Sequence, residues 1–175
     1  MLLFKYTADW ITHFESIKTK IKNAIGTNTY IIEHVASTSV PLLDAKPIID
    51  IDIVYKTHDD FTIIKSGLEK IGYYHHGNQG IEDRDVFKRS KSSDDPILDT
   101  IQHHLYVCPL HSKALERHIL TRDYLRKNQW ARLQYQKMKY EMAERANQGR
   151  KVYQVLKEEN INGFLDSIIL NEGSI

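Results

Sequence analysis

The sequence has one cysteine, no long apolar run and almost no net charge. With Cys108 alone, the chain cannot form an internal disulfide bond or a zinc site with several cysteines, which is typical of proteins from a reducing compartment. No segment approaches the roughly 20 apolar residues that a membrane-spanning helix needs. Lys5, Asp9 and His13 interrupt the apolar residues near the N-terminus, which argues against a signal peptide. We therefore expect a cytoplasmic protein with no membrane partner.

The charges of the chain nearly cancel, with 24 basic and 23 acidic residues and a formal net charge of +1. Such a chain has no long-range field that attracts DNA or RNA, so we expect no nucleic-acid partner, and any contact with phosphate has to be local. Apolar residues make up 41% of the sequence and charged residues 27%, which is ordinary for a globular protein. The length of 175 residues predicts a single domain over residues 1–175.

Hydrophobic periodicity predicts an α+β fold, with a mixed sheet followed by a helical C-terminal half. Apolar residues recur at helical spacing in two early segments, and each of these ends at a glycine. After Pro109 no strand signal appears. The expected helices cover residues 8–25, 59–71 and 161–170, with a further helical region over 112–147, and the expected strands cover 30–35, 47–55, 85–89 and 100–108.

The strand PIIDIDIVY carries two carboxylates. Side chains alternate along a strand, so Asp50 and Asp52 project from one face. A strand this apolar is expected at the centre of a sheet, where two neighbouring like charges weaken folding unless a cation neutralises them. Oxygen ligands at this spacing suit Mg²⁺ or Mn²⁺. In the alternative interpretation the strand lies at an edge and both aspartates face water.

The loop HVASTSVP precedes this strand. Ser37, Thr38 and Ser39 offer hydroxyl and backbone donors, to which a phosphate could dock. The alternative is an ordinary turn and helix cap ahead of Leu42 and Leu43.

These segments carry a family resemblance. EHVASTSVPLLDAKPIIDIDIVY is similar to the signature segment of the GrpB family, whose members look like nucleotidyltransferases. The similarity continues in the same order through GIEDRDVFKR, HHLYV, RDYLR and YQVLK, and so covers nearly the whole chain. The resemblance implies a nucleotidyltransferase-like mixed β-sheet with flanking helices.

The resemblance also implies a mechanism. Ser37 takes the role of the serine in the triphosphate-binding loop, and Asp50 and Asp52 become catalytic residues that bind two Mg²⁺ or Mn²⁺ ions. One ion would position the phosphates of a nucleoside triphosphate, and the other would activate the hydroxyl of a small-molecule acceptor. Some relatives are fused to dephospho-CoA kinase, which links the family to coenzyme A metabolism.

Two positions depart from the pattern of the family. Ala36 stands where the family usually has the loop glycine, so the backbone there could adopt a different φ. Nucleotidyltransferases also supply a third carboxylate from a later strand, whereas IQHHLYV offers His103 and His104 and no acid. His104 beside the two aspartates would favour transition metals. In the alternative, one histidine packs inward with a hydrogen-bond partner and the other faces solvent. Glu33 is the best substitute carboxylate.

Several basic residues match family positions and could meet phosphates. The alternative is a set of solvated surface charges, or, for the arginines of TRDYLR, a salt bridge that fastens the helical half to the sheet. The candidates are Lys46, Arg84, Lys88, Arg122, Arg126 and Lys157, and His34 is added as a neighbour of the loop.

Three functions follow from these patterns. The first is transfer of a nucleotidyl or phosphoryl group from a nucleoside triphosphate to an unknown small acceptor. The second is a non-catalytic member of the same fold that binds a nucleotide or a metal, which the alanine at position 36 and the missing third acid favour. The third is a metal-dependent hydrolase built from the same aspartates and histidines.

Overall fold

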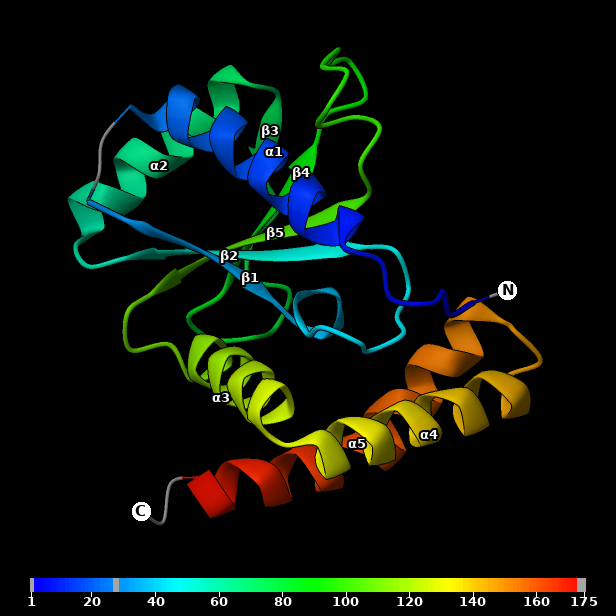
Figure 1. The fold of residues 1–175 in the computed structure, drawn as a ribbon. Coiled ribbons are helices and arrows are strands. Elements are labelled where there is room, and N and C mark those ends of the chain that lie inside the picture. The colour runs from blue at the N-terminus through cyan, green and yellow to red at the C-terminus, as the bar shows by residue number, and fades with distance from the viewer. Residues whose placement is uncertain (1, 27–28, 173–175) are drawn as a thin grey trace.

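The computed structural model describes residues 2–26 and 29–172, apart from the side chains of residues 158, 162 and 168–172. Five strands form one sheet in the order β1-β2-β5-β4-β3 (Figure 1). Strands β2 and β5 are parallel, and the other neighbours are antiparallel. The strands are β1 (Ile31–Val35), β2 (Ile49–Tyr55), β3 (Tyr73–His75), β4 (Asp85–Arg89) and β5 (His103–Pro109).

Helices cover both sides of this sheet (Figure 1). On one side lie α1 (Asp9–Ile25) and α2 (His58–Lys70). On the other side lie α3 (Lys113–Lys127), α4 (Gln129–Arg145) and α5 (Arg150–Glu172), which form the helical C-terminal half. The short 3-10 helix η1 (Ser37–Ser39) follows β1. The predicted α+β class and mixed sheet are confirmed.

The two N-terminal helices form as the sequence predicts. Helix α1 buries Trp10, Phe14 and other apolar residues on one face and ends at Gly26, whose φ of +74° is natural for glycine. Helix α2 begins with a capping box in which Thr57 and Asp60 satisfy each other's backbone N–H groups. A Cβ on Gly67 would lie 2.8 Å from the Cα of Ile25, so the two helices approach closely at this glycine.

The central strand positions the two aspartates. Strand β2 lies between β1 and β5, so the alternative of an edge strand is wrong. Ile49, Ile51 and Ile53 are buried in the core beneath α1 and α2. Burying each isoleucine contributes about 1.5–3 kcal/mol, and a one-residue slip would place the isoleucines on the opposite face. This burial therefore holds Asp50 and Asp52 on the side of the sheet that faces the helical half.

The helical half differs from the sequence-based prediction in its boundaries. Asn128 separates α3 from α4, and α5 starts at Arg150 rather than at residue 161. The early part of α5 is rich in charge, but it buries Tyr153 against α4, and this tertiary contact extends the helix. The side chains of residues 168–170, at the end of the helix expected over 161–170, lie outside the described ones. Strand β3 was not among the expected strands; its pairing with β4 makes it one.

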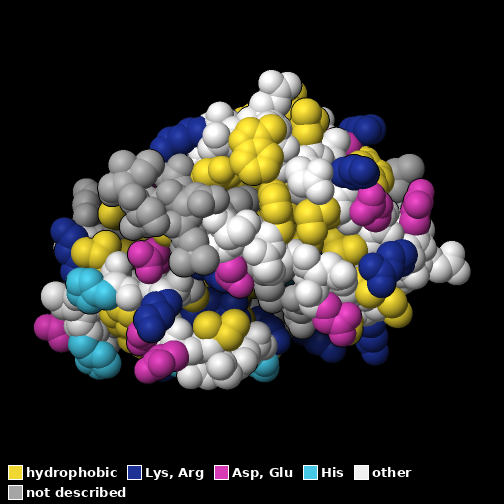
Figure 2. Space-filling view, turned by 90° about the horizontal axis from the view of Figure 1, so that it is seen from below, with side chains coloured by type: hydrophobic (Ala, Val, Ile, Leu, Met, Phe, Trp, Pro, Cys, Tyr) yellow, Lys and Arg dark blue, Asp and Glu magenta, His cyan; other side chains and the backbone are white. Residues whose placement is uncertain are grey.

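A second apolar cluster joins the loop after β1 to the helical half. It includes Leu43, Leu125, Tyr135 and Tyr153. Figure 2 shows the molecule from the side of the helical half, with exposed hydrophobic side chains among acidic and basic ones. The exposed ones on α4 and α5 are Trp130, Leu133, Val152 and Val155. Within the described part of the chain, no helix combines the length and the apolar character needed to span a membrane.

Candidate active site

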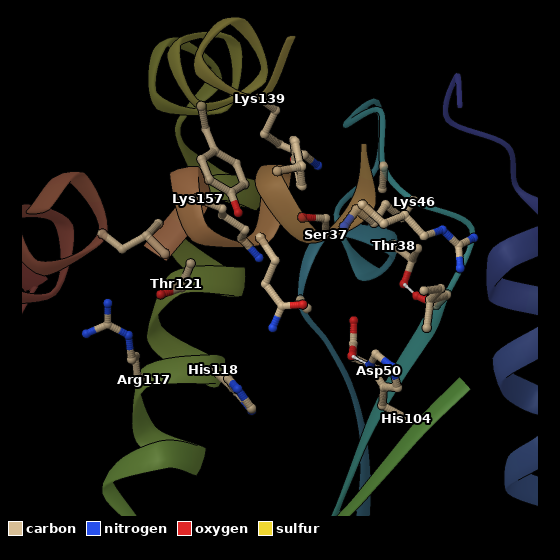
Figure 3. Close-up of a pocket in the computed structure, with 18 of the residues that line it drawn as sticks. Ser37, Thr38, Lys46, Asp50, His104, Arg117, His118, Thr121, Lys139 and Lys157 are labelled. Atoms are coloured by element: carbon tan, nitrogen blue, oxygen red, sulfur yellow. Dashed lines mark hydrogen bonds and ion pairs between the residues drawn. The ribbon is translucent and has the colours of Figure 1, made fainter. Parts of the chain in front are cut away.

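A cavity of about 540 Å³ lies between the sheet and the helical half. Figure 3 shows Asp50 and His104 where the sheet reaches the cavity and Ser37 on the loop above them. Helix α3 presents Arg117, His118 and Thr121 from the opposite wall, and α4 and α5 present Lys139 and Lys157. The cavity therefore joins residues that are more than 100 positions apart in the sequence.

The two aspartates are each held by a histidine. His118 donates its Nδ1–H to Oδ2 of Asp52 at 2.7 Å, and His104 donates its Nδ1–H to Oδ1 of Asp50 at 2.9 Å. Asp52 is completely buried, and its Oδ1 has no hydrogen-bond partner among the described residues. An unsatisfied buried carboxylate oxygen is costly, so this atom is poised to accept a cation or a donor.

The carboxylates fit a divalent metal ion. Mg²⁺ and Mn²⁺ bind to one or two carboxylates and complete their coordination with waters and substrate phosphates. Asp50 and Asp52 share one face of β2, and the orphaned Oδ1 of Asp52 provides a free ligand atom. Among the described residues, no group of three or more His, Cys, Asp and Glu side chains is arranged around a metal position. A metal ion bound here would have the aspartate pair as its protein ligands, with His104 bonded to one of them.

His118 was missed by the sequence analysis. It lies four residues before Arg122 and therefore on the same face of α3, which packs on β1 and β2. A signal was available in this spacing, because Arg122 was already a candidate. Only the placement of α3 over the sheet, however, brings His118 to Asp52.

His103 and His104 point to opposite faces of β5. His103 donates its Nδ1–H to the carbonyl of Ile101, and its Nε2 accepts the hydroxyl proton of Tyr73 at 2.6 Å. The side chain of His104 is 54% exposed beside Asp50. The alternative interpretation, with one histidine packed inward on a hydrogen-bond partner and the other facing solvent, describes this arrangement, except that the exposed His104 also lines the cavity.

The serine loop contributes Ser37 and Thr38 to the lining of the cavity. No hydrogen bond within the loop occupies the hydroxyl of Ser37 among those described, whereas the hydroxyls of the next two residues are engaged. Thr38 is buried, bonded to His34 Nε2 at 3.0 Å and donating to the carbonyl of Ile48. Ser39 donates its hydroxyl to the carbonyl of Ala36. Thr38 and Ser39 therefore stabilise the loop, and Ser37 is the residue placed to meet a phosphate.

His34 and Arg126 support this loop from behind. His34 stacks on Phe14, and burial, together with the nearby Arg126, lowers its pKa to about 4. It is therefore neutral near pH 7 and holds Thr38 without adding charge. Arg126 donates two hydrogen bonds to the carbonyl of Ser39. Neither side chain lines the cavity.

Ala36 adopts a backbone conformation that glycine adopts without strain, with φ 57° and ψ −160°. An alanine here carries strain of about 1–3 kcal/mol, and the lower chain entropy of alanine in the unfolded state offsets up to about 1 kcal/mol of it. We expect Ala36→Gly to raise the free energy of unfolding by about 1 kcal/mol, measured by urea denaturation. Ala45→Gly, at a buried position with no positive φ, serves as the control and should destabilise; stabilisation by both changes would contradict the strain.

Basic residues form the wall opposite Asp50. Lys46, Lys139, Arg150, Lys151 and Lys157 line the cavity, and Arg117 approaches it from α3. Lys46 lies over the ring of Tyr153, 4.3 Å from its centroid. Burial lowers the pKa of Lys46, and the neighbouring charges of Lys157 and Arg150 lower it further. Like charges gathered in this way favour an anionic ligand between them.

Arg84 and Lys88 lie outside the cavity lining. Arg84 stacks on the ring of Tyr106 at 4.6 Å, and its Nε is buried with no partner among the described residues. Burial and the Asp50 carboxylate raise the pKa of Tyr106 to about 12. Lys88 is exposed on β4, where it pairs with Tyr74 of the edge strand β3. Arg84 therefore borders the site through Tyr106, whereas Lys88 does not reach it.

Glu33 and Arg122 form an ion pair at 2.6 Å, and Arg122 also bonds to Asp123 and to the carbonyl of His34. Glu33 sits beside Asp52 in the register of β1 and β2, but its side chain is committed to this arginine. The pair is the salt bridge that fastens α3 to the sheet. Neither side chain lines the cavity, so Glu33 does not supply a third carboxylate there.

Comparison with known proteins places this chain in a family. The YqkA protein of Bacillus subtilis is 30% identical over 138 residues, which cover 79% of this chain. The chain spans only 38% of that relative's length. The crystal structure of the conserved protein GrpB from Enterococcus faecalis superposes with a TM-score of 0.78 at 25% identity and covers 98% of this chain and 99% of that one.

A more distant neighbour shows the fold class. The structure of Cid1 in complex with its short product ApU superposes with a TM-score of 0.56 over 81% of this chain and 43% of that one. At 10% identity this likeness concerns the fold alone. The fold of the chain is similar to that of the nucleotidyltransferase Cid1. The GrpB protein family matches residues 1–167, and the chain therefore belongs to the GrpB family.

Proposed function

We propose that this protein binds a nucleoside triphosphate together with Mg²⁺ or Mn²⁺ and transfers a nucleotidyl or phosphoryl group to a small acceptor. The observation that carries the proposal is the position of Asp50 and Asp52. They share one face of a central strand. Asp50 lies beneath the loop of Ser37 in a cavity lined by lysines, and Asp52 is buried and bonded to His118, which also lines this cavity. A metal ion and a polyphosphate need carboxylates and cations at adjacent places, and this cavity offers both.

Different residues of the chain would bind the metal, orient the phosphates and fix the carboxylates. Asp50 and Asp52 would hold the metal, which supplies charge neutralisation at the phosphates when it is bound. Ser37 would orient a phosphate through its hydroxyl, and Lys46 and Lys157 would neutralise the far end of the polyphosphate. His118 and His104 would fix the orientation of the two carboxylates, as partners of metal ligands commonly do.

The test is binding of ATP, GTP, CTP and UTP in the presence of Mn²⁺, measured by calorimetric titration. We expect at least one of them to bind, and Asp50→Asn to weaken this binding by about tenfold or more, because one negative ligand is lost. Lys88→Gln is the matched control, since it removes a charge outside the cavity. Failure of all four nucleotides to bind, or equal binding by Asp50→Asn, would refute the proposal.

A second candidate is a member that binds the nucleotide without turnover. The observation that favours it is the pairing of Glu33 with Arg122, which leaves the two aspartates without a third acid from β1. Under this alternative, nucleotide binding persists while no pyrophosphate or nucleoside diphosphate is released across a panel of small acceptors. Release of either product with any acceptor favours the first proposal.

A further inference from the structure

Lys139 is a buried amine in the wall of the cavity. Its side chain extends from α4, is 3% exposed, and donates from Nζ to the backbone carbonyl of Asp44 at 2.6 Å. The carboxylate of Asp44 does not serve as its counter-ion, because the two oxygens are engaged by Lys5, the backbone N–H of Tyr6, and the hydroxyl of Tyr140. A buried lysine whose partner is a neutral carbonyl is costly to keep charged.

The charges around Lys139 add to this cost. Burial lowers the pKa of Lys139 well below its usual value, and the cations Lys157 and Lys46 lower it further. Asp44 and Asp50 act in the opposite direction, but more weakly than burial and Lys157 together. From its own helix, the ring of Tyr135 lies 5.4 Å from Nζ. With no anion in the cavity, the charged form of Lys139 is therefore disfavoured beside two other basic side chains.

We propose that Lys139 binds the terminal phosphate of the cavity's polyphosphate ligand as an ammonium, so that ligand binding takes up one proton from solvent. A phosphate placed between Lys46, Lys139 and Lys157 reverses the balance of charge at the amine. The amine can then keep its bond to Asp44 and donate a second N–H to the anion. The inference deepens the proposed function by naming the residue that recognises the end of the phosphate chain.

The geometry explains why a lysine is needed at this position. Tyr135, Lys139 and Met142 follow one another on the buried face of α4. An apolar residue would be buried on that face at a lower free-energy cost, and an arginine would remain charged when no anion is bound. A lysine, unlike either of these, can lose its proton in the core and regain it when an anion arrives. The lysine in an otherwise apolar stripe is also a signal in the sequence that we missed.

The experiment uses inorganic tripolyphosphate as the probe, so that neither a base nor a metal is required. The heat of binding is measured by calorimetry at one pH in buffers of different ionisation enthalpy, and its slope gives the number of protons taken up. We expect about one proton for the wild type. For Lys139→Met we expect almost none, together with an affinity about tenfold lower. Lys137→Met, an exposed lysine on the same helix, should match the wild type.

The outcomes separate this inference from the proposed function. Wild-type binding without proton uptake, no binding of tripolyphosphate, or uptake that persists in Lys139→Met would overturn the role of Lys139. The first two results use the wild-type protein, so they hold even if the variant fails to fold. Proton-linked binding of tripolyphosphate supports the inference even where nucleotide binding proves indifferent to Asp50→Asn, a result that would refute only the metal-nucleotide proposal.

Discussion

Mn²⁺ is expected to stabilise the wild-type protein against thermal unfolding and to stabilise the Asp52→Asn variant much less. Asp52 is completely buried, with Oδ2 bonded to His118 and Oδ1 without a partner among the described residues. A ligand that binds the folded state alone stabilises it by about 2.7 kcal/mol at a concentration 100 times its dissociation constant. Asparagine removes the charge that attracts the ion, so most of this stabilisation should disappear.

The same substitution should cost little when no metal is present. Asparagine has nearly the shape of aspartate, and its carbonyl oxygen can still accept the N–H of His118. Thermal melting curves with and without Mn²⁺ are the measurement, and Asp94→Asn, which changes an exposed carboxylate far from the cavity, is the control. Equal stabilisation of the wild type and Asp52→Asn by Mn²⁺ would show that the ion binds elsewhere.

The part of the site on the sheet could be predicted because its residues lie close together in the sequence. Alternation in PIIDIDIVY, with isoleucines on the core face, already places Asp50 and Asp52 together on the other face. The loop before the strand is adjacent in sequence, so Ser37 follows from the same segment. What the segment does not reveal is that Thr38 and Ser39 use their hydroxyls within the loop.

The helical half of the site could not be predicted because it depends on packing between distant segments. His118 reaches Asp52 only because α3 lies over β2. Lys139 reaches the carbonyl of Asp44 only because α4 lies beside residues 44–46. Arg122 illustrates the same limit. The sequence analysis named it and Arg126 among residues that could meet phosphates, but in the structure Arg122 bonds to Glu33 and Arg126 bonds to a backbone carbonyl.

Arg122→Leu is therefore expected to lower the free energy of unfolding by about 2 kcal/mol. This is below the range of about 3–5 kcal/mol for breaking a fully buried ion pair, because the side chains of Glu33 and Asp123 are 31% and 39% exposed. The side chain of Arg122 is 10% exposed, and its guanidinium bridges Glu33, Asp123 and the carbonyl of His34. Leucine would leave the Glu33 carboxylate beside Asp52 with no cation between α3 and the sheet. Urea denaturation gives the free energy, and Lys127→Leu, at an exposed site on the same helix, should change it by less than about 0.5 kcal/mol.

A second substitution tests whether Arg122 stabilises the packing of α3 on the sheet or contacts the ligand. If the cost of Arg122→Leu arises from the stranded carboxylate, the double variant Glu33→Gln, Arg122→Leu should recover about 1–2 kcal/mol of the lost stability. If the losses of stability from the two substitutions are strictly additive, the unpaired Glu33 carboxylate is not the cause. Because α3 also carries His118, the single variant should lose the Mn²⁺-dependent stabilisation in part, whereas the double variant should regain it along with the position of the helix. Recovery of stability without recovery of the Mn²⁺ effect would instead assign Arg122 a direct role at the metal and phosphate site.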